Sequence, residues 1–129
     1  MEALVVEMVM LTEAKETDNK LRWDARIGRT DFSLYVPKWR VPRPWPRLIE
    51  VTVRPYTGEA THPRSPRGGL QYNVHPITCH LDKVSEHTRT IRYRPDGVNA
   101  KLWELGEPYI PTPMTFDGSP QLTIEVNWR

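Results

Sequence analysis

Cysteine is nearly absent from this sequence of 129 residues, because Cys79 is the only one and no internal disulfide can form. A disulfide-stapled secreted scaffold is therefore excluded. No stretch approaches the roughly 18 consecutive apolar residues of a membrane-spanning helix. The first residues lack the basic and apolar regions of a signal peptide. We expect a cytoplasmic protein, or one found in a virion or the host cytoplasm if the chain is of phage origin.

Catalytic and metal-binding motifs are missing as well. Gly68-Gly69 lacks the spacing of a dinucleotide or P-loop motif. If residues 77–81 form a strand, His75 and Cys79 are about 13 Å apart, too far to share one ion. His80 with His87 across a hairpin is the one remaining geometry for a metal. We therefore predict a non-catalytic protein with no cofactor and no metal site.

An excess of charge of one sign is also absent, since 18 Lys and Arg against 16 Asp and Glu leave a net charge of +2. This balance excludes a global polycation but not a local basic patch. Prolines, in contrast, number 13, roughly twice the average usage, and they are scattered along the chain. Long uninterrupted helices are therefore not expected.

Short segments with β-branched residues and period-two alternation predict strands instead. In residues 48–53, for example, Ile49, Val51 and Val53 share one face while Glu50 and Thr52 share the other. The predicted strands are residues 4–11, 21–25, 32–36, 48–53 and 77–81, with residues 15–20 as a hairpin turn and residues 70–74 as an extra edge strand.

The two halves of the chain repeat this pattern. At a constant offset of 70, the residues Leu11, Glu16, Leu21, Arg22 and Trp23 match Leu81, Glu86, Ile91, Arg92 and Tyr93. Further matches pair Leu34-Tyr35 with Leu102-Trp103 and Ile49-Glu50-Val51 with Ile124-Glu125-Val126. The proline-rich loops 37–46 and 106–120 then occupy equivalent places.

The repeat predicts a single all-β domain, a sandwich or barrel of seven to nine strands built from two related β units. The first unit covers about residues 4–54 and the second about residues 70–129. Residues 55–69 form an exposed connection that is rich in proline and glycine. A monomer or a homodimer is compatible with this plan.

A resemblance follows from the first half. The stretch Lys15-Glu16-Thr17-Asp18-Asn19-Lys20-Leu21-Arg22-Trp23, then Leu34-Tyr35-Val36-Pro37-Lys38 and Ile49-Glu50-Val51-Thr52-Val53, resembles a loose pattern of small uncharacterised bacterial and phage β proteins. The second half departs from that pattern, with Glu104 and Leu105 where Pro37 and Lys38 would stand. The resemblance implies a β fold and no catalytic residue.

Residues 38–47 are the most unusual part of the sequence. They hold four cations, two tryptophans and three prolines with no acid, so their local charge is about +4. Prolines favour an extended ribbon whose side chains splay outward. Arginine matches phosphate geometry and tryptophan offers a stacking face to a base, as single-stranded nucleic-acid binding requires. Since Leu21 and Trp23 should face the core, Arg22 and its equivalent Arg92 should face outward.

We predict nucleic-acid binding, preferably single-stranded, as the function. The predicted contact residues are Lys38, Trp39, Arg40, Arg43, Trp45, Arg47, Arg22 and Arg92. The alternative is a structural or assembly component, of a phage particle or a multiprotein complex, that uses the same loops for protein contacts. A third reading is structural: Trp39 and Trp45 roof one end of a barrel, and the arginines pair with acids such as Glu50 and Glu125.

Overall fold

The protein is all-β. The computed structural model describes residues 6–10, 14–56, 58, 73–97 and 99–129; in β1 only the backbone is described. Within these residues the strands are β1 (Val6–Met10), β2 (Lys15–Glu16), β3 (Lys20–Ile27), β4 (Thr30–Pro37), β5 (Ile49–Pro55), β6 (Ile77–Glu86), β7 (Thr90–Pro95), β8 (Tyr109–Pro111) and β9 (Gln121–Trp128). Three short 3-10 helices join them: η1 (Lys38–Arg40), η2 (Ala100–Leu102) and η3 (Thr112–Met114).

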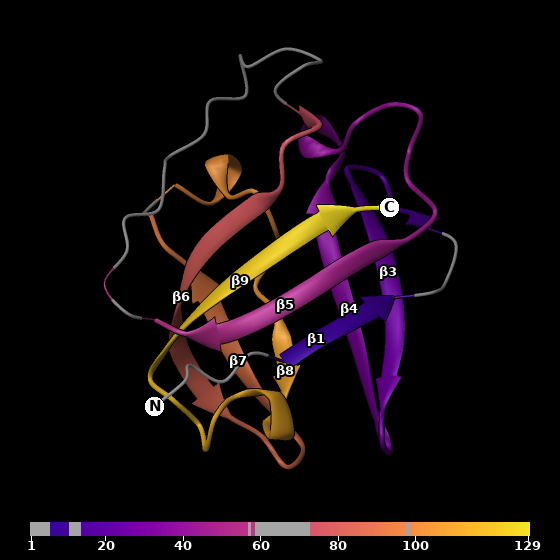
Figure 1. The fold of residues 1–129 in the computed structure, drawn as a ribbon. Helices are drawn as coiled ribbons and strands as arrows, with labels where there is room; N and C mark the ends of the chain where they lie inside the picture. The colour runs from indigo at the N-terminus through magenta and orange to yellow at the C-terminus, as the bar shows by residue number, and fades with distance from the viewer. Residues whose placement is uncertain (1–5, 11–13, 57, 59–72, 98) are drawn as a thin grey trace.

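The strands form two antiparallel sheets around one core (Figure 1). The larger sheet has the order β1-β5-β9-β6-β7-β8, and the smaller has the order β2-β3-β4. The larger sheet curls, so that β7 and β8 lie behind β5 and β9, and β4 lies beside β8 (Figure 1). The prediction of a sandwich or barrel is confirmed.

Buried apolar residues alternate with more exposed residues along the strands, and the apolar side chains fill this core, as expected for sheets with one face covered. Ile49, Val51 and Val53 of β5 are fully buried, while the residues between them are half-buried. The same rule buries Leu21 and Trp23 in β3. Each such apolar side chain contributes about 1.5–3 kcal/mol on leaving water, which stabilises both sheets.

The two units share one hydrogen-bonding plan. Glu16 pairs with Leu21 between β2 and β3, and Glu86 pairs with Ile91 between β6 and β7, at the predicted offset of 70. The first strand of each unit also pairs with its last one, β1 with β5 and β6 with β9. The last strands, β5 and β9, then pair with each other at the centre of the larger sheet.

One predicted correspondence between the halves is wrong. Leu34-Tyr35 lies in β4, whereas Leu102 ends η2 and Trp103 follows it, so these segments are not equivalent. The structural match of β4 is β8, because each pairs with the second long strand of its own unit. Tyr35-Val36-Pro37 thus corresponds to Tyr109-Ile110-Pro111, and a 3-10 helix follows each proline. Pro111, rather than Glu104, occupies the place of Pro37.

Some predicted boundaries need adjustment. The hairpin turn is shorter than residues 15–20, since β2 and β3 take in its two ends. Of the first predicted strand, residues 4, 5 and 11 lie outside the described residues. In the predicted edge strand 70–74, Asn73 and Val74 are not in a strand, and residues 70–72 lie outside the described residues. Most of the predicted connection 55–69 also lies outside the described residues. Among the described residues, no helix has the length and apolarity to span a membrane.

Candidate functional site

Residues 38–47 do not form the predicted extended ribbon. Pro37 sets an extended conformation, but the next three residues close a turn of 3-10 helix, in which the Val41 amide donates to the Lys38 carbonyl at 3.3 Å. This turn directs Arg40, Val41 and Pro42 inward, where all three are buried. Only the ends of the segment remain near the surface.

Arg40 is therefore removed from the predicted contact surface, because its side chain is fully buried. Its Nε donates to Glu104 Oε1 at 2.5 Å, and its terminal nitrogens donate to the carbonyls of Asn73, His75 and Pro76 at 2.8–3.1 Å. A buried guanidinium is tolerated when a carboxylate and several carbonyls satisfy it in this way. Arg40 ties together segments of both units and offers no donor to a ligand.

A cavity of about 580 Å³ lies beside this segment, and we call it the tryptophan–lysine groove. It contains two indoles, Trp39 and Trp103, and three lysines, Lys20, Lys38 and Lys101. Its complete lining is Asp18, Asn19, Lys20, Pro37, Lys38, Trp39, Ala100, Lys101, Trp103, Leu105, Gly106 and Glu107.

Backbone contacts bring the second unit against the first to form this groove. The Gly106 amide donates to the Tyr35 carbonyl of β4 at 2.8 Å. A Cβ at position 106 would lie 3.4 Å from the Cβ of Tyr35, so glycine allows the close approach. Asn99 caps η2 by accepting from the Lys101 amide at 3.0 Å, and Trp103 Nε1 donates to the Gly97 carbonyl at 3.1 Å. These hydrogen bonds hold η2 and Trp103 in place as the wall that the second unit contributes to the groove.

The charges in the groove are unequally compensated. Lys38 is held by Glu16 at 2.6 Å, while Lys20 and Lys101 make no ion pair within the described part of the chain. Glu107 receives two bonds of 2.7 Å, from Arg92 and Arg94. The hydrogen bond from Arg92 in particular lowers the pKa of Glu107 below 4.5. Its negative charge is thus largely cancelled on the groove wall.

Trp45 does not line the tryptophan–lysine groove. It lines a shallow pocket of about 540 Å³ formed by Pro44, Trp45, Pro46, Arg47, Leu48 and Arg129. The guanidinium of Arg43 lies 4.7 Å from the Trp45 ring centroid, and the Lys38 ammonium lies 5.7 Å from it. Through these cation–π contacts, the two cations cover the ring of Trp45. Trp39 thus lines one cavity and Trp45 lines another, and Lys38 lines the first while its ammonium lies near the Trp45 ring.

Arg22 and Arg92 face outward from β3 and β7, as the strand parity predicts, but each contacts an acid. Arg22 Nε lies 3.0 Å from Asp24 Oδ1, and Arg92 Nη2 lies 2.7 Å from Glu107 Oε1. A side-chain hydrogen bond with Tyr35, and then the charge of Asp24, raise the pKa of Arg22. Neither arginine is in the groove lining.

Within the described residues, the histidines and the cysteine do not form one cluster. Cys79 faces the core, and burial raises the pKa of its thiol to about 12, which leaves it unsuited as a nucleophile or ligand. His87 lies 3.0 Å from Ser85 Oγ and against Tyr109, away from His80. Glu50 is paired with Arg129 at 2.7 Å, as expected for an outward strand position.

Sequence reasoning missed Trp103, Lys101 and Lys20 as groove residues. An indole two positions after a lysine was a weak local signal in the second half. Nothing in either local segment indicated that η2 would lie against the end of β4, since this depends on the tertiary contact of Gly106. No protein-family model, curated protein or solved structure matches the chain.

Proposed function

We propose that this protein is a non-catalytic binding protein for single-stranded nucleic acid and that the tryptophan–lysine groove is its binding site. The observation that carries the proposal is the meeting of Trp39 from one unit and Trp103 from the other in one cavity with three lysines. Aromatic faces bind bases of any sequence, and lysines beside them bind the phosphates. A volume of about 580 Å³ is in the range of ligand sites.

The charges of the groove support an anionic ligand. Lys20 and Lys101 have no carboxylate partner among the described residues, so a phosphate would not have to displace one. Glu107 is neutralised by two arginines, which reduces its repulsion of a phosphate. Arg22 and Arg92, which are already paired with acids, contribute to the local field rather than to direct contacts in this proposal.

The test is fluorescence anisotropy with a labelled oligothymidylate of about 15 nucleotides, titrated at two salt concentrations. We expect Trp103→Ala and Trp39→Ala each to weaken binding by between about fivefold and about 160-fold, as the loss of about 1–3 kcal/mol per stacked base requires. Trp45→Phe is the matched control, because its ring is covered by Arg43 and Lys38. Affinity that is indifferent to salt, or equal losses in all three variants, would refute the proposal.

A second candidate function is an assembly role, and two observations favour it. The arginines Arg22 and Arg92 are ion-paired, and Tyr35 and Tyr109 are large side chains with exposed fractions of 36% and 46% on the adjacent strands β4 and β8. Paired arginines and exposed aromatics are typical of protein interfaces. Co-purification with a defined partner at fixed stoichiometry after nuclease treatment, lost on Tyr109→Ala, would favour this role. Cytoplasmic location and a monomeric or homodimeric state stay predictions.

A further inference from the structure

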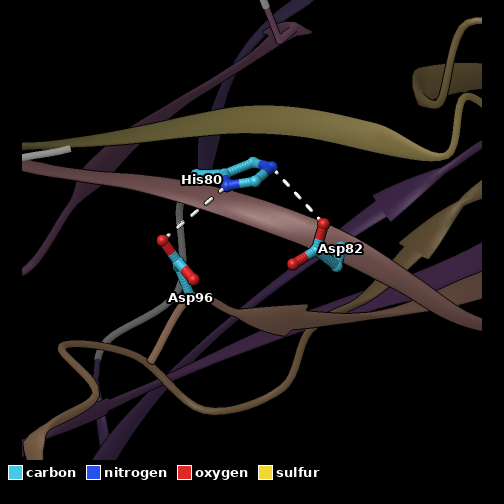
Figure 2. Close-up of side chains that lie close together, drawn as sticks. All are labelled: His80, Asp82 and Asp96. Atoms are coloured by element: carbon cyan, nitrogen blue, oxygen red, sulfur yellow. Dashed lines mark ion pairs between the residues drawn. The ribbon is translucent and has the colours of Figure 1, made fainter. Parts of the chain in front are cut away.

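A second group of polar side chains lies outside the groove, on the outer face of the larger sheet. His80 and Asp82 are two residues apart on β6 and share that face, and Asp96 follows β7 directly (Figure 2). The Asp96 amide donates to the His80 carbonyl at 3.1 Å, which holds the two segments together. One nitrogen or oxygen from each of the three side chains lies within 4.8 Å of the others.

The imidazole of His80 is held in place but has no hydrogen-bond partner in the part of the chain that the structure describes. It stacks on Tyr56 with ring centroids 4.0 Å apart and planes inclined by 17°, and its side chain is only 11% exposed. Nε2 is 3.5 Å from Asp82 Oδ1 and Nδ1 is 3.9 Å from Asp96 Oδ2, which are longer than hydrogen bonds (Figure 2). Nε2 is buried and has no partner among the described residues. Such a group in a native protein requires an explanation.

The two carboxylates are oriented yet uncompensated. Gln121 Nε2 donates to Asp82 Oδ1 at 3.3 Å, and the Gly97 amide donates to Asp96 Oδ1 at 2.9 Å. No lysine or arginine within the described ranges pairs with either aspartate, although most other acids described here have such a partner. Two negative charges thus face one imidazole.

We infer that His80, Asp82 and Asp96 form a binding site for one divalent transition-metal ion. The ion would neutralise both carboxylates and satisfy a nitrogen of His80. A tetrahedral ion about 2.1 Å from each ligand atom holds these atoms about 3.4 Å apart. Since they are now separated by up to 4.8 Å, the carboxylates must move inward by roughly 1 Å. Asp82 and Asp96 are 51% and 61% exposed, which leaves them free to do so.

The ligand types indicate which metals the site takes. One imidazole nitrogen with two carboxylate oxygens suits Zn²⁺ or Mn²⁺, whereas Mg²⁺ and Ca²⁺ prefer oxygen alone. Gln121 and the Gly97 amide already orient the carboxylates, as the outer partners of metal ligands do. Cys79 precedes His80 in the chain but faces the core, so it is not a ligand. The site is independent of the tryptophan–lysine groove.

Isothermal titration of the full chain with ZnCl₂, and separately with MgCl₂, tests this inference. We expect one Zn²⁺ per chain and at least tenfold weaker binding of Mg²⁺. Asp96→Asn should weaken Zn²⁺ binding at least tenfold, and circular dichroism will show that this exposed substitution leaves the fold intact. Asp31→Asn, at an exposed position on β4, is the matched control and should change nothing.

A second measurement locates the ion. Substoichiometric Mn²⁺ should broaden the amide NMR signals of residues 80–82 and 96–97 first, because broadening falls steeply with distance. His87→Gln should leave both results unchanged, since His87 lies elsewhere. Absence of Zn²⁺ binding, equal binding by Asp96→Asn, or broadening centred on another histidine would overturn the inference.

Discussion

Arg40 Nε and Glu104 Oε1 are 2.5 Å apart in the protein interior, and they join the two β units across 64 positions of sequence. Both side chains are buried, at 0% and 8% exposure. Arg40 belongs to η1 at the end of the first unit's smaller sheet, and Glu104 belongs to the loop that forms the far wall of the groove. The pair therefore holds together segments that flank the tryptophan–lysine groove, and neither residue lines the groove.

The first prediction concerns this pair. Glu104→Gln leaves the Arg40 guanidinium buried without its compensating charge, which should lower the free energy of unfolding by about 3–5 kcal/mol. Urea denaturation followed by fluorescence measures this loss. Asp31→Asn breaks the exposed Arg26–Asp31 pair, whose atoms are 3.7 Å apart, and should cost less than about 1 kcal/mol. Equal losses in the two variants would contradict a structural role for Arg40.

The second prediction concerns the lysines of the groove. If Lys20 and Lys101 each contact a phosphate, replacing both by alanine should reduce the slope of log affinity against log salt by about 1.4, because each contact to a single strand contributes about 0.7. Anisotropy titrations with the same oligonucleotide at several salt concentrations measure this slope. Lys15→Ala is the control, because Lys15 pairs with Asp24 and does not line the groove. An unchanged slope in the double variant would place the phosphates elsewhere.

The third prediction concerns acid stability. The pKa of Glu107 is lower in the folded protein than its ordinary value of 4.5, chiefly because of the hydrogen bond from Arg92. At acidic pH the unfolded chain then binds more protons than the folded protein does. The stabilisation by the Glu107 carboxylate is therefore present above pH 4.5 and is lost as the pH falls through and below that value. Glu107→Gln should lose less stability than wild type between pH 6 and about pH 3.

Urea midpoints measured across this range test the prediction for Glu107. Glu125→Gln is the control, since the Glu125 carboxylate accepts from Asn127 and has no ion pair among the residues the structure describes. An unaltered pH profile for Glu107→Gln would show that the two arginines do not stabilise its charge in solution.

The fourth prediction concerns Cys79. Its thiol is 9% exposed and its pKa is about 12, so the reactive thiolate is scarce at neutral pH and hard to reach. An aromatic disulfide reagent should modify it only after unfolding, with one equivalent released per chain in concentrated urea. Rapid modification of the folded protein would show that the strand bearing Cys79 opens readily.

The strands were predictable because their alternation depends on neighbours in the chain. Ile49, Val51 and Val53 are buried for that reason, and the outward orientation of Arg22 follows from the same parity. Arg40 could not be assigned in this way. Its sequence neighbourhood is as basic and proline-rich as that of Arg43, and only Glu104, from the other unit, makes its burial possible.

The same limit applies to the groove and to the repeat. Trp39 was predicted to bind a ligand, but its partner Trp103 depends on a contact between loops of different units. The offset of 70 was found for Glu16 and Glu86, whereas insertions after β7 concealed the match between Pro37 and Pro111. Pairing register reveals that match because hydrogen bonds align strands regardless of loop length.

The position of β9 has a consequence for folding kinetics. β9 is the last strand in sequence, yet it lies between β5 and β6 in the larger sheet and hydrogen-bonds to both. Until it is in place, β1 with β5 and β6 with β7 and β8 are separate ribbons that cannot close a core. Contacts between residues so distant in sequence slow folding, so we expect refolding in milliseconds to seconds rather than microseconds. Destabilising substitutions in β9 should then slow the folding of both β units to the same extent, as stopped-flow refolding would measure.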